Sequence, residues 1–292
     1  MSSEQKPFAL SVVNDEISQD FGRACEVASR QMGVRWIELR SMWDKNIINL
    51  DSGEIAEAER LVKKNDLQVI AITGPLFKVD WPGAPQSKAE QRDQFNSSFT
   101  FDQQNDVLER SIALAKSFGT KFVRSFDFWR LDDPALYRDA MNERLRQAAE
   151  RAGSNGITLL LENEHACNTG TAAEAADVLN AVESSYLMLV WDPGNAAQRG
   201  ETPFPDGYQL LPKNRIAHCH CKDVVRQGKG YAWACVGQGI IDWPGQFRAL
   251  QRDGYCGAVS LETHWRGAGT AEASSLQSWT GMRAALREAE IL

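Results

Sequence analysis

Acidic and imidazole side chains stand at the ends of four consecutive apolar runs in the second half of the chain. Glu162 ends the run ITLLLE, Asp192 ends LMLVWD and Glu262 ends AVSLE, while the run IAHCHC between the last two carries His218 and His220. Three carboxylates buried side by side repel one another unless a cation neutralises them. Carboxylate oxygens with one imidazole nitrogen suit Mn2+, Mg2+ or Co2+, and Zn2+ can also take such ligands. The pattern therefore predicts one divalent metal ion.

The histidine-bearing run also alternates in a way that separates two faces of a strand. His218, His220 and Lys222 share one face, and Cys219 and Cys221 share the other. We expect the histidine face to point into the site and the cysteines to pack as core residues. Each charged residue taken singly has a simpler interpretation, because a glutamate at a strand end is usually a solvated loop residue or a helix cap. The metal prediction depends on the coincidence of four such ends.

Eight short apolar runs alternate with longer amphipathic segments along the whole chain. Strands separated by helices imply right-handed crossovers and a parallel sheet, and eight such units most often close into a barrel. We predict a single (β/α)8 TIM barrel over residues 1–292, with the polar strand ends at its C-terminal mouth. The expected strands cover residues 8–13, 34–39, 68–72, 121–126, 158–161, 187–191, 216–221 and 258–261. The expected helices cover residues 20–32, 52–65, 103–118, 134–152, 171–182, 208–211, 243–253 and 273–290.

A doubly wound open sheet is the alternative architecture. Such sheets usually carry a glycine-rich first turn, and here that turn reads NDEIS. The chain contains neither a Gly-x-Gly-x-x-Gly nor a Walker A pattern, so we expect no nucleotide site of those kinds.

Composition limits the partners and the compartment. The formal net charge of -7 disfavours binding to the phosphate backbone, so we expect no nucleic acid partner. The six cysteines are scattered without a Cys-x-x-Cys pair, which is typical of reduced thiols in the cytosol. We see neither a signal peptide nor an apolar run long enough to span a membrane, and we expect a cytoplasmic protein.

The same strand ends resemble the motifs of a known family, the xylose isomerase-like or sugar phosphate isomerase/epimerase superfamily. Ketose 3-epimerases, hydroxypyruvate isomerases and inosose dehydratases belong to it. The matching motifs are Leu161-Glu162-Asn163, Val190-Trp191-Asp192-Pro193-Gly194-Asn195, His220-Cys221-Lys222-Asp223, Gly237-Gln238-Gly239-Ile240-Ile241-Asp242 and Ser260-Leu261-Glu262. Each motif is weak alone, but the ordered set at these spacings is specific, and the likeness covers nearly the whole chain.

The resemblance implies roles for individual residues. It makes Glu162, Asp192, His220 and Glu262 the metal ligands, with Mn2+ as the expected metal, and it makes the two glutamates the acid/base pair on opposite faces of the substrate. It also assigns substrate contacts to Arg226, which follows the histidine of the seventh strand. One position departs from the epimerase pattern: Asn195 stands where many of them carry a substrate-binding histidine, and an asparagine cannot titrate. We expect substrate or supporting contacts from a further set, namely Asn195, His218, Glu164 and Lys222.

These residues predict a sugar isomerase or epimerase that abstracts a proton next to a carbonyl through a metal-stabilised enediolate. A dehydratase of the inosose dehydratase type is the closest alternative, because loss of hydroxide from the same site gives dehydration. An abasic-site endonuclease would need more histidines than the four in this chain, and a non-catalytic sugar-binding barrel would be expected to lack a ligand. We expect an unphosphorylated carbohydrate substrate and a homo-oligomer, either a dimer or a tetramer.

Overall fold

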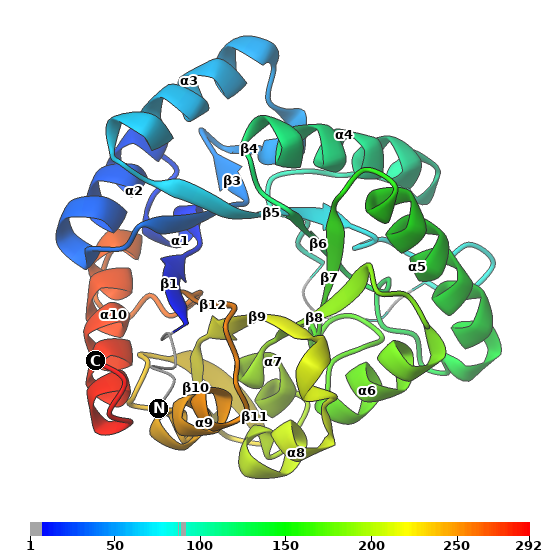
Figure 1. Ribbon diagram of the computed structural model, residues 1–292. Coiled ribbons are helices and arrows are strands. Elements are labelled where there is room, and N and C mark those ends of the chain that lie inside the picture. Colours follow the sequence, from blue (N-terminus) through cyan, green and yellow to red (C-terminus); the bar gives the residue numbers. More distant parts are fainter. Residues whose placement is uncertain (1–7, 87, 89–91) are drawn as a thin grey trace, which may run out of the picture.

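Eight parallel strands form a ring surrounded by helices (Figure 1). The structure is a computed structural model that describes residues 8–86, 88 and 92–292. Each strand pairs in parallel with its neighbours, and a parallel bridge between Val13 and Glu38 joins the first strand to the second. The predicted barrel is confirmed. Its strands are β1 (Ala9–Val12), β2 (Trp36–Leu39), β5 (Gln68–Leu76), β6 (Phe122–Ser125), β7 (Thr158–Glu162), β8 (Leu187–Trp191), β9 (Ile216–Cys221) and β12 (Ala258–Leu261).

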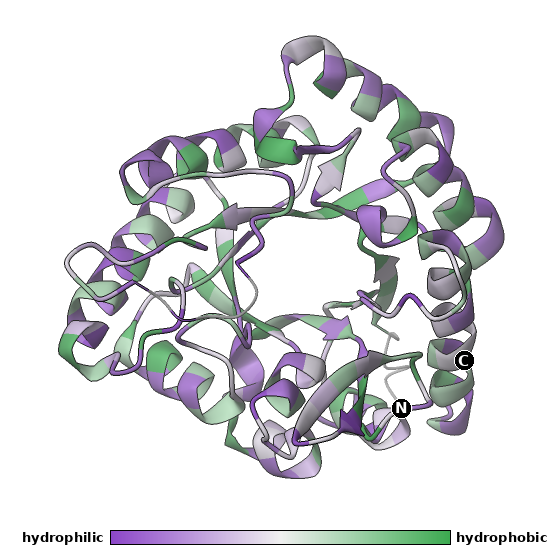
Figure 2. Cartoon of the chain, turned by 180° about the vertical axis from the view of Figure 1, so that it is seen from behind, coloured by the Kyte–Doolittle hydropathy of each residue, from purple (hydrophilic) through white to green (hydrophobic). Residues whose placement is uncertain are grey.

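The helices that cover the barrel are amphipathic, and Figure 2 shows hydrophilic and hydrophobic residues alternating along them. Capping boxes start two of them: Asp51 and Glu54 exchange hydrogen bonds at the head of α3, and Thr171 and Glu174 do so at α6. The helices are α1 (Asn14–Ile17), α2 (Phe21–Glu26) with a π-helical continuation (Val27–Met32), α3 (Ser52–Lys64), α4 (Gln104–Ser117), α5 (Arg138–Gly153), α6 (Ala172–Ala181), α7 (Pro193–Gln198), α8 (Tyr208–Leu210), α9 (Trp243–Arg252) and α10 (Ala271–Glu288).

Three features at the mouth of the barrel differ from the sequence prediction. Strand β5 continues past residue 72 to Leu76. Helix α7 was not predicted, because its six residues, PGNAAQ, are too few to show a helical period. Two antiparallel hairpins were also missed: β3 (Ser41–Met42) with β4 (Lys45–Asn46), and β10 (Asp223–Gln227) with β11 (Gly230–Ala234). These short elements follow barrel strands and shape the rim.

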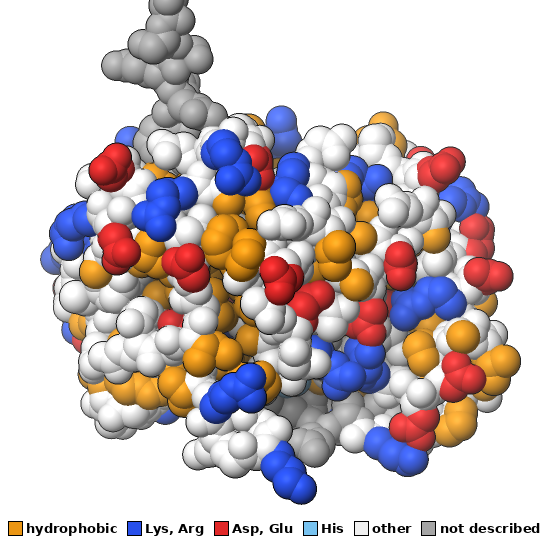
Figure 3. Space-filling view, turned by 90° about the horizontal axis from the view of Figure 1, so that it is seen from below, with side chains coloured by type: hydrophobic (Ala, Val, Ile, Leu, Met, Phe, Trp, Pro, Cys, Tyr) orange, Lys and Arg blue, Asp and Glu red, His pale blue; other side chains and the backbone are white. Residues whose placement is uncertain are grey.

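The main apolar core lies between the strands and the helices. Cys219 and Cys221 are fully buried within it, as the alternation of β9 predicts. Figure 3 shows lysine and arginine interspersed with aspartate and glutamate, and apolar patches between them, on the face seen from below. Among the described residues no helix is both long and apolar enough to cross a bilayer.

Candidate functional site

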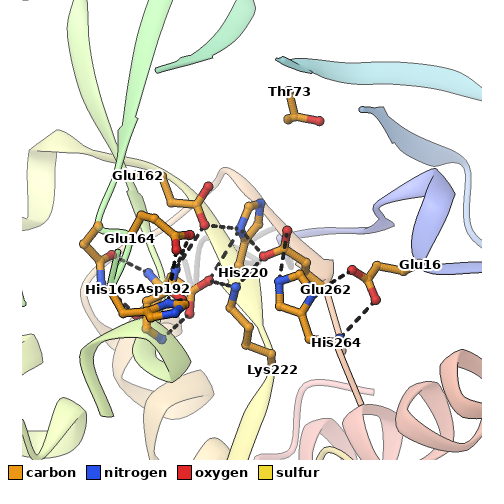
Figure 4. A network of polar contacts seen from close by, with 12 residues as sticks. Glu16, Thr73, Glu162, Glu164, His165, Asp192, His220, Lys222, Glu262 and His264 are labelled. Atoms are coloured by element: carbon orange, nitrogen blue, oxygen red, sulfur yellow. Dashed lines mark hydrogen bonds and ion pairs between the residues drawn. The ribbon is translucent and has the colours of Figure 1, made fainter. Parts of the chain in front are cut away.

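Four buried side chains converge at the C-terminal ends of neighbouring strands (Figure 4). Glu162 ends β7, Asp192 follows β8, His220 lies on β9 and Glu262 follows β12. One ligand atom from each of them lies within 4.8 Å of the others. The Nδ1 atom of His220 is 3.2 Å from Glu162 Oε1, 3.6 Å from Asp192 Oδ2 and 3.2 Å from Glu262 Oε2. The structure therefore brings together all four residues predicted to bind the metal, and we call them the carboxylate–histidine cluster.

Asp192 is held in place by the helix that it starts. Its Oδ1 accepts a hydrogen bond of 2.9 Å from the backbone N–H of Asn195, and Pro193 occupies the first helical position of α7. This cap directs the other oxygen towards the cluster. Among the described residues Oδ2 is buried without a hydrogen-bond partner, although Lys222 Nζ lies 2.8 Å away as an ion pair. The Asp192 carboxylate thus caps the helix with one oxygen and turns the other, paired with Lys222, towards the cluster.

The far side of the His220 ring contacts a second carboxylate. Its Nε2 is 3.4 Å from Glu38 Oε2, while Glu38 Oε1 is 2.7 Å from His218 Nε2 and Ser260 Oγ is 3.1 Å from that same nitrogen. Burial alone would lower the pKa of His220, but the surrounding carboxylates, above all Glu262, raise it well above its ordinary value. A carboxylate behind a ligating imidazole fixes the ring and its tautomer, so Glu38 orients Nδ1 towards the cluster.

Among the residues that the structure describes, three buried cations contact the carboxylates of the cluster. Arg124 Nη1 lies 2.9 Å from Glu162 Oε2, and Arg40 Nη1 hydrogen-bonds Glu262 Oε1. Lys222 Nζ is 2.5 Å from Glu262 Oε2. Each glutamate therefore has one oxygen held by an arginine and the other turned towards His220, an arrangement that fixes both side chains before any ligand binds.

These contacts set the protonation of the site. Burial would raise the pKa of Glu162, but His220 and Arg124 lower it. Burial acts in the same direction on Glu262, and Lys222 and His220 hold its pKa well below the ordinary value. For Lys222, burial favours the neutral amine, yet Asp192 and Glu262 raise its pKa. At neutral pH both glutamates are ionised and able to accept a proton, and Lys222 carries one.

The donor set fits a divalent cation. It combines three carboxylate oxygens with one imidazole nitrogen whose ring is oriented from behind, as in ligand sets for Mn2+, Mg2+ or Zn2+. Asp192 Oδ2 faces the same cluster, 3.6 Å from His220 Nδ1, with the Lys222 ammonium as its charge partner. Lys222 contacts oxygens of two of these carboxylates, so an ammonium and a metal ion would compete for them.

A cavity of about 120 Å³ lies at the mouth of the barrel, and we call it the mouth cavity. The Trp233 side chain from hairpin β10–β11 borders it and lies 5.2 Å from the Lys222 ammonium, measured to the ring centroid. A larger cleft of about 740 Å³ shares Trp233 and His165 with it and extends along the hairpin. The residues lining the mouth cavity are Lys78, Asp93, Phe95, Glu164, His165, Trp233 and His264.

Residues 27–284 match the model of a protein family described as the xylose isomerase-like TIM barrel. The chain belongs to this family. A search of curated proteins finds no match. The family assignment confirms the resemblance inferred from the strand-end motifs.

Solved structures similar to this xylose isomerase-like barrel share its fold at low sequence identity. One is described as the IOLI protein with a bound zinc atom (TM-score 0.72, 16% identity, 97% of this chain and 98% of that chain). A second is AsbF from Bacillus anthracis, a probable 3-DHS dehydratase (TM-score 0.70, 17% identity, 95% of this chain and 98% of that chain). A third is the 3-keto-D-glucoside 4-epimerase YcjR from E. coli (TM-score 0.68, 16% identity, 95% of this chain and 99% of that chain).

In this xylose isomerase-like barrel, three of the predicted supporting residues lie beside the cluster. Asn195 Nδ2 donates to Glu162 Oε1 at 3.2 Å and to Glu164 Oε2 at 3.4 Å. Its Oδ1 is 3.1 Å from His165 Nδ1. Lys222 touches the cluster directly, as described above. Asn195 thus links the cluster to the wall of the mouth cavity without offering a titratable group.

The other two predicted contact residues lie elsewhere. Arg226 is exposed on β10, where its guanidinium stands 5.5 Å from the centroid of the Tyr231 ring. His218 lies on the same face of β9 as His220 but is buried between Glu38 and Ser260. The structure therefore places His218 behind the cluster and gives Arg226 no direct contact with it among the described residues.

Sequence reasoning missed the charged residues that surround the cluster. Glu38 was noticed only as part of a familiar strand, while Arg40, Arg124 and Lys78 were not identified. A signal was present for two of them: Arg124 interrupts the apolar strand FVRS, and Arg40 follows Glu38 by two positions in WIELR. A charged side chain on the inward face of a barrel strand has to find a partner inside, so such positions are worth examining.

Proposed function

We propose that this protein is a divalent-metal-dependent enzyme that isomerises or epimerises a sugar by abstracting a proton next to a carbonyl. The observation that carries the proposal is the group of four ligand atoms within 4.8 Å of one another at the barrel mouth. The names of similar proteins agree with this class, since they include an epimerase and a zinc-containing barrel. In the proposal Glu162, Asp192, His220 and Glu262 hold the ion, with Mn2+ as the expected metal.

The chain's own groups supply the proton chemistry. Glu162 and Glu262 come from β7 and β12, with β8 and β9 between them, so they approach the cluster from different sides. Both are ionised, and each is held by an arginine through one oxygen. We assign one as the base that takes the proton and the other as the group that returns it. A bound divalent ion would polarise the substrate carbonyl and so make the neighbouring C–H more acidic.

Dehydration is the second candidate, and Lys222 is the observation that favours it. Its ammonium lies 2.5 Å from Glu262 Oε2, so a charged proton donor stands inside the site. Elimination of water requires protonation of the departing hydroxyl, which such a donor can provide. A probable dehydratase among the similar structures is consistent with this reaction.

Solvent deuterium exchange tests the proposal. Mn2+-loaded protein is incubated in D2O with ketoses, inososes and hydroxy-keto acids, and products are read by mass spectrometry. Deuterium gain without loss of mass identifies isomerisation or epimerisation, and loss of water identifies dehydration. Glu162→Gln and Glu262→Gln should lower the exchange rate by about 100-fold or more, with exposed Glu183→Gln as the matched control.

Binding of Mn2+ to each variant is measured separately by electron paramagnetic resonance. This separates loss of the base from loss of the ion, because glutamine keeps one oxygen at the ligand position. Exchange that persists unchanged in both variants would contradict the assignment of the acid/base pair. Metal-loaded wild-type protein that exchanges no substrate would contradict the proposed reaction class.

A further inference from the structure

Among the buried lysine and arginine residues that the structure describes, Lys78 is the one without a carboxylate at hydrogen-bond distance. Its side chain is 4% exposed. The other three buried lysine and arginine residues, Arg40, Arg124 and Lys222, each hold carboxylates at close range. The carboxylate nearest to Lys78 Nζ is Glu164, whose Oε2 is 3.9 Å away. Among the described residues the ammonium makes no hydrogen bond, although it has three N–H groups to offer.

Three aromatic rings lie close to the Lys78 ammonium, and one of them, Phe95, also lines the mouth cavity. Nζ lies 4.2 Å from the ring centroid of Phe95, 4.7 Å from that of Phe126 and 5.4 Å from that of Trp129. Ring faces attract a cation, and this attraction offsets part of the cost of burial. They accept no conventional hydrogen bond, however, so the N–H groups remain available to a ligand in the mouth cavity that Lys78 lines.

The backbone around Lys78 is held firmly. Phe77, just before it, has φ 63°, a left-handed conformation that is uncommon for an aromatic residue. Its N–H donates to Gln104 Oε1 at 2.7 Å, and its carbonyl accepts from the N–H of Phe128 at 2.9 Å. The carbonyl of Val79 accepts in the same way from Trp129 at 2.9 Å. A backbone conformation of this kind persists only where the surrounding contacts enforce it. These contacts therefore fix the position from which the Lys78 side chain reaches the cavity.

We propose that Lys78 and Glu164 together bind one hydroxyl group of a neutral polyol. This inference rests on the proposed function and specifies its substrate class. A hydroxyl both accepts and donates, so it can accept from the ammonium and donate to the carboxylate 3.9 Å away. A phosphate or carboxylate could accept from Lys78 but would be repelled by Glu164.

Charge balance in the mouth cavity supports an uncharged ligand. Two carboxylates, Asp93 and Glu164, line this cavity together with Lys78. His165 lies 3.1 Å from Glu164, and although burial would lower its pKa, Glu164 raises it. With His165 and His264 as its imidazoles, the described lining holds one lysine against two carboxylates, so it lacks the surplus of donors with positive charge that binds a phosphate.

The position of Lys78 also relates it to the chemistry. Glu164 Oε2 accepts from Asn195, and Asn195 donates in turn to Glu162. The bound hydroxyl would thus be linked to the cluster through Glu164 and Asn195, at the end of the substrate remote from its carbonyl. Lys78 is a binding residue in this proposal, and its contact sets which substrate carbon faces Glu162.

Ligand binding to a matched set of variants tests the inference. Mg2+-loaded wild-type protein, Lys78→Met and Lys78→Gln are titrated with neutral ketoses and inososes and with the corresponding ketose phosphates. Tryptophan fluorescence gives the signal, since Trp129 and Trp233 lie beside the cavity. Lys116→Met is the control, because Lys116 is exposed and bonds only Asn155 among the described residues.

We expect the wild type to bind a neutral polyol more tightly than its phosphate. Lys78→Met should weaken that binding by about 10- to 100-fold, the usual effect of losing a charged hydrogen bond, and Lys78→Gln should fall between. Affinity for Mg2+ should stay within error of wild type, because Lys78 contacts none of the four cluster residues in the described chain. The melting temperature of Lys78→Met should fall, since Glu164 loses its buried ion-pair partner, so binding is compared at a temperature where circular dichroism shows both proteins folded.

Three outcomes would overturn the assignment. These are unchanged polyol binding in Lys78→Met, preference of the wild type for the phosphates, and failure of every neutral polyol to bind. The deuterium exchange assay keeps the two proposals distinguishable. Lys78-dependent binding without exchange would leave this inference standing and refute the proposed reaction, whereas exchange that is indifferent to Lys78→Met would do the opposite.

Discussion

Replacing Lys222 with methionine should lower the stability of the metal-free protein and raise its affinity for a metal ion. The ammonium lies 2.8 Å from Asp192 Oδ2 and 2.5 Å from Glu262 Oε2, and all three side chains are buried. Removing one member of a buried ion pair typically costs about 3–5 kcal/mol, because the partner charge is left unpaired. For a protein of this size that corresponds to a fall of about 5–8 °C in melting temperature.

The effect on metal binding has the opposite sign. Two unit charges 4 Å apart interact with about 4 kcal/mol at an effective dielectric constant of 20, and a divalent ion doubles that repulsion. A flexible lysine can move away from the ion, so we take only a fraction of this energy. We expect Lys222→Met to bind Mn2+ at least about tenfold more tightly than wild type, which requires about 1.4 kcal/mol.

Both effects are measured together by thermal unfolding and calorimetric titration, each with and without Mn2+. The metal-induced rise in melting temperature should be larger in Lys222→Met than in wild type, and the exposed-site variant Lys116→Met should behave as wild type. Weaker Mn2+ binding in Lys222→Met would refute the competition argument. An unchanged melting temperature without metal would refute the ion pairing on which the argument depends.

Further predictions concern charge and thiol chemistry. Arg124→Met should lower stability by about 3–5 kcal/mol in chemical unfolding, because the guanidinium holds Glu162 and the carbonyl of Thr73 in the barrel interior; a loss below 1 kcal/mol would contradict this. Burial would raise the pKa of Glu38, but its histidine partners lower it below the value in the unfolded chain. Ionised Glu38 therefore stabilises the folded protein fully above about pH 4.3, its pKa in the unfolded chain, and this contribution is lost as pH falls through the pKa in the folded protein. The melting temperature of Glu38→Gln should therefore depend less on pH below pH 4.3, and parallel curves for variant and wild type would contradict it. Of the six cysteines, Cys256 alone is exposed, so a thiol reagent should label one site quickly and Cys256→Ser should abolish that phase.

The barrel and the cluster could both be predicted because their signals are local and repeated. Each barrel strand is a short apolar run, and Glu162, Asp192 and Glu262 stand at the ends of three of them. In a parallel barrel all such ends meet at one rim, so position along the chain becomes position in space. The alternation of β9 was sufficient to separate His220 from the outward cysteines.

The parts that could not be predicted depend on contacts between distant segments. Lys78 belongs to an irregular segment after β5, and its meaning comes from Phe95 and Glu164, which lie 17 and 86 positions further along the chain. Hairpin β10–β11 was missed because each of its strands is only five residues long, and β10 carries charged and polar residues without a clear alternation. Nor does strand alternation alone indicate that His218 and His220 share Glu38, which lies on β2, three strands away around the ring.

The proton inventory of the site indicates how one arrangement can serve several reactions. The Asn195 side-chain amide hydrogen-bonds Glu162, Glu164 and His165. Because an amide does not titrate, Asn195 neither gives nor takes a proton. In the proposed function, the two glutamates of the cluster then exchange protons with the substrate, and Lys222 can donate a proton to Glu262. Epimerisation, isomerisation and dehydration differ in which substrate atom faces each group. That choice is made by whatever fixes the remote end of the substrate, which is the role that we assign to Lys78.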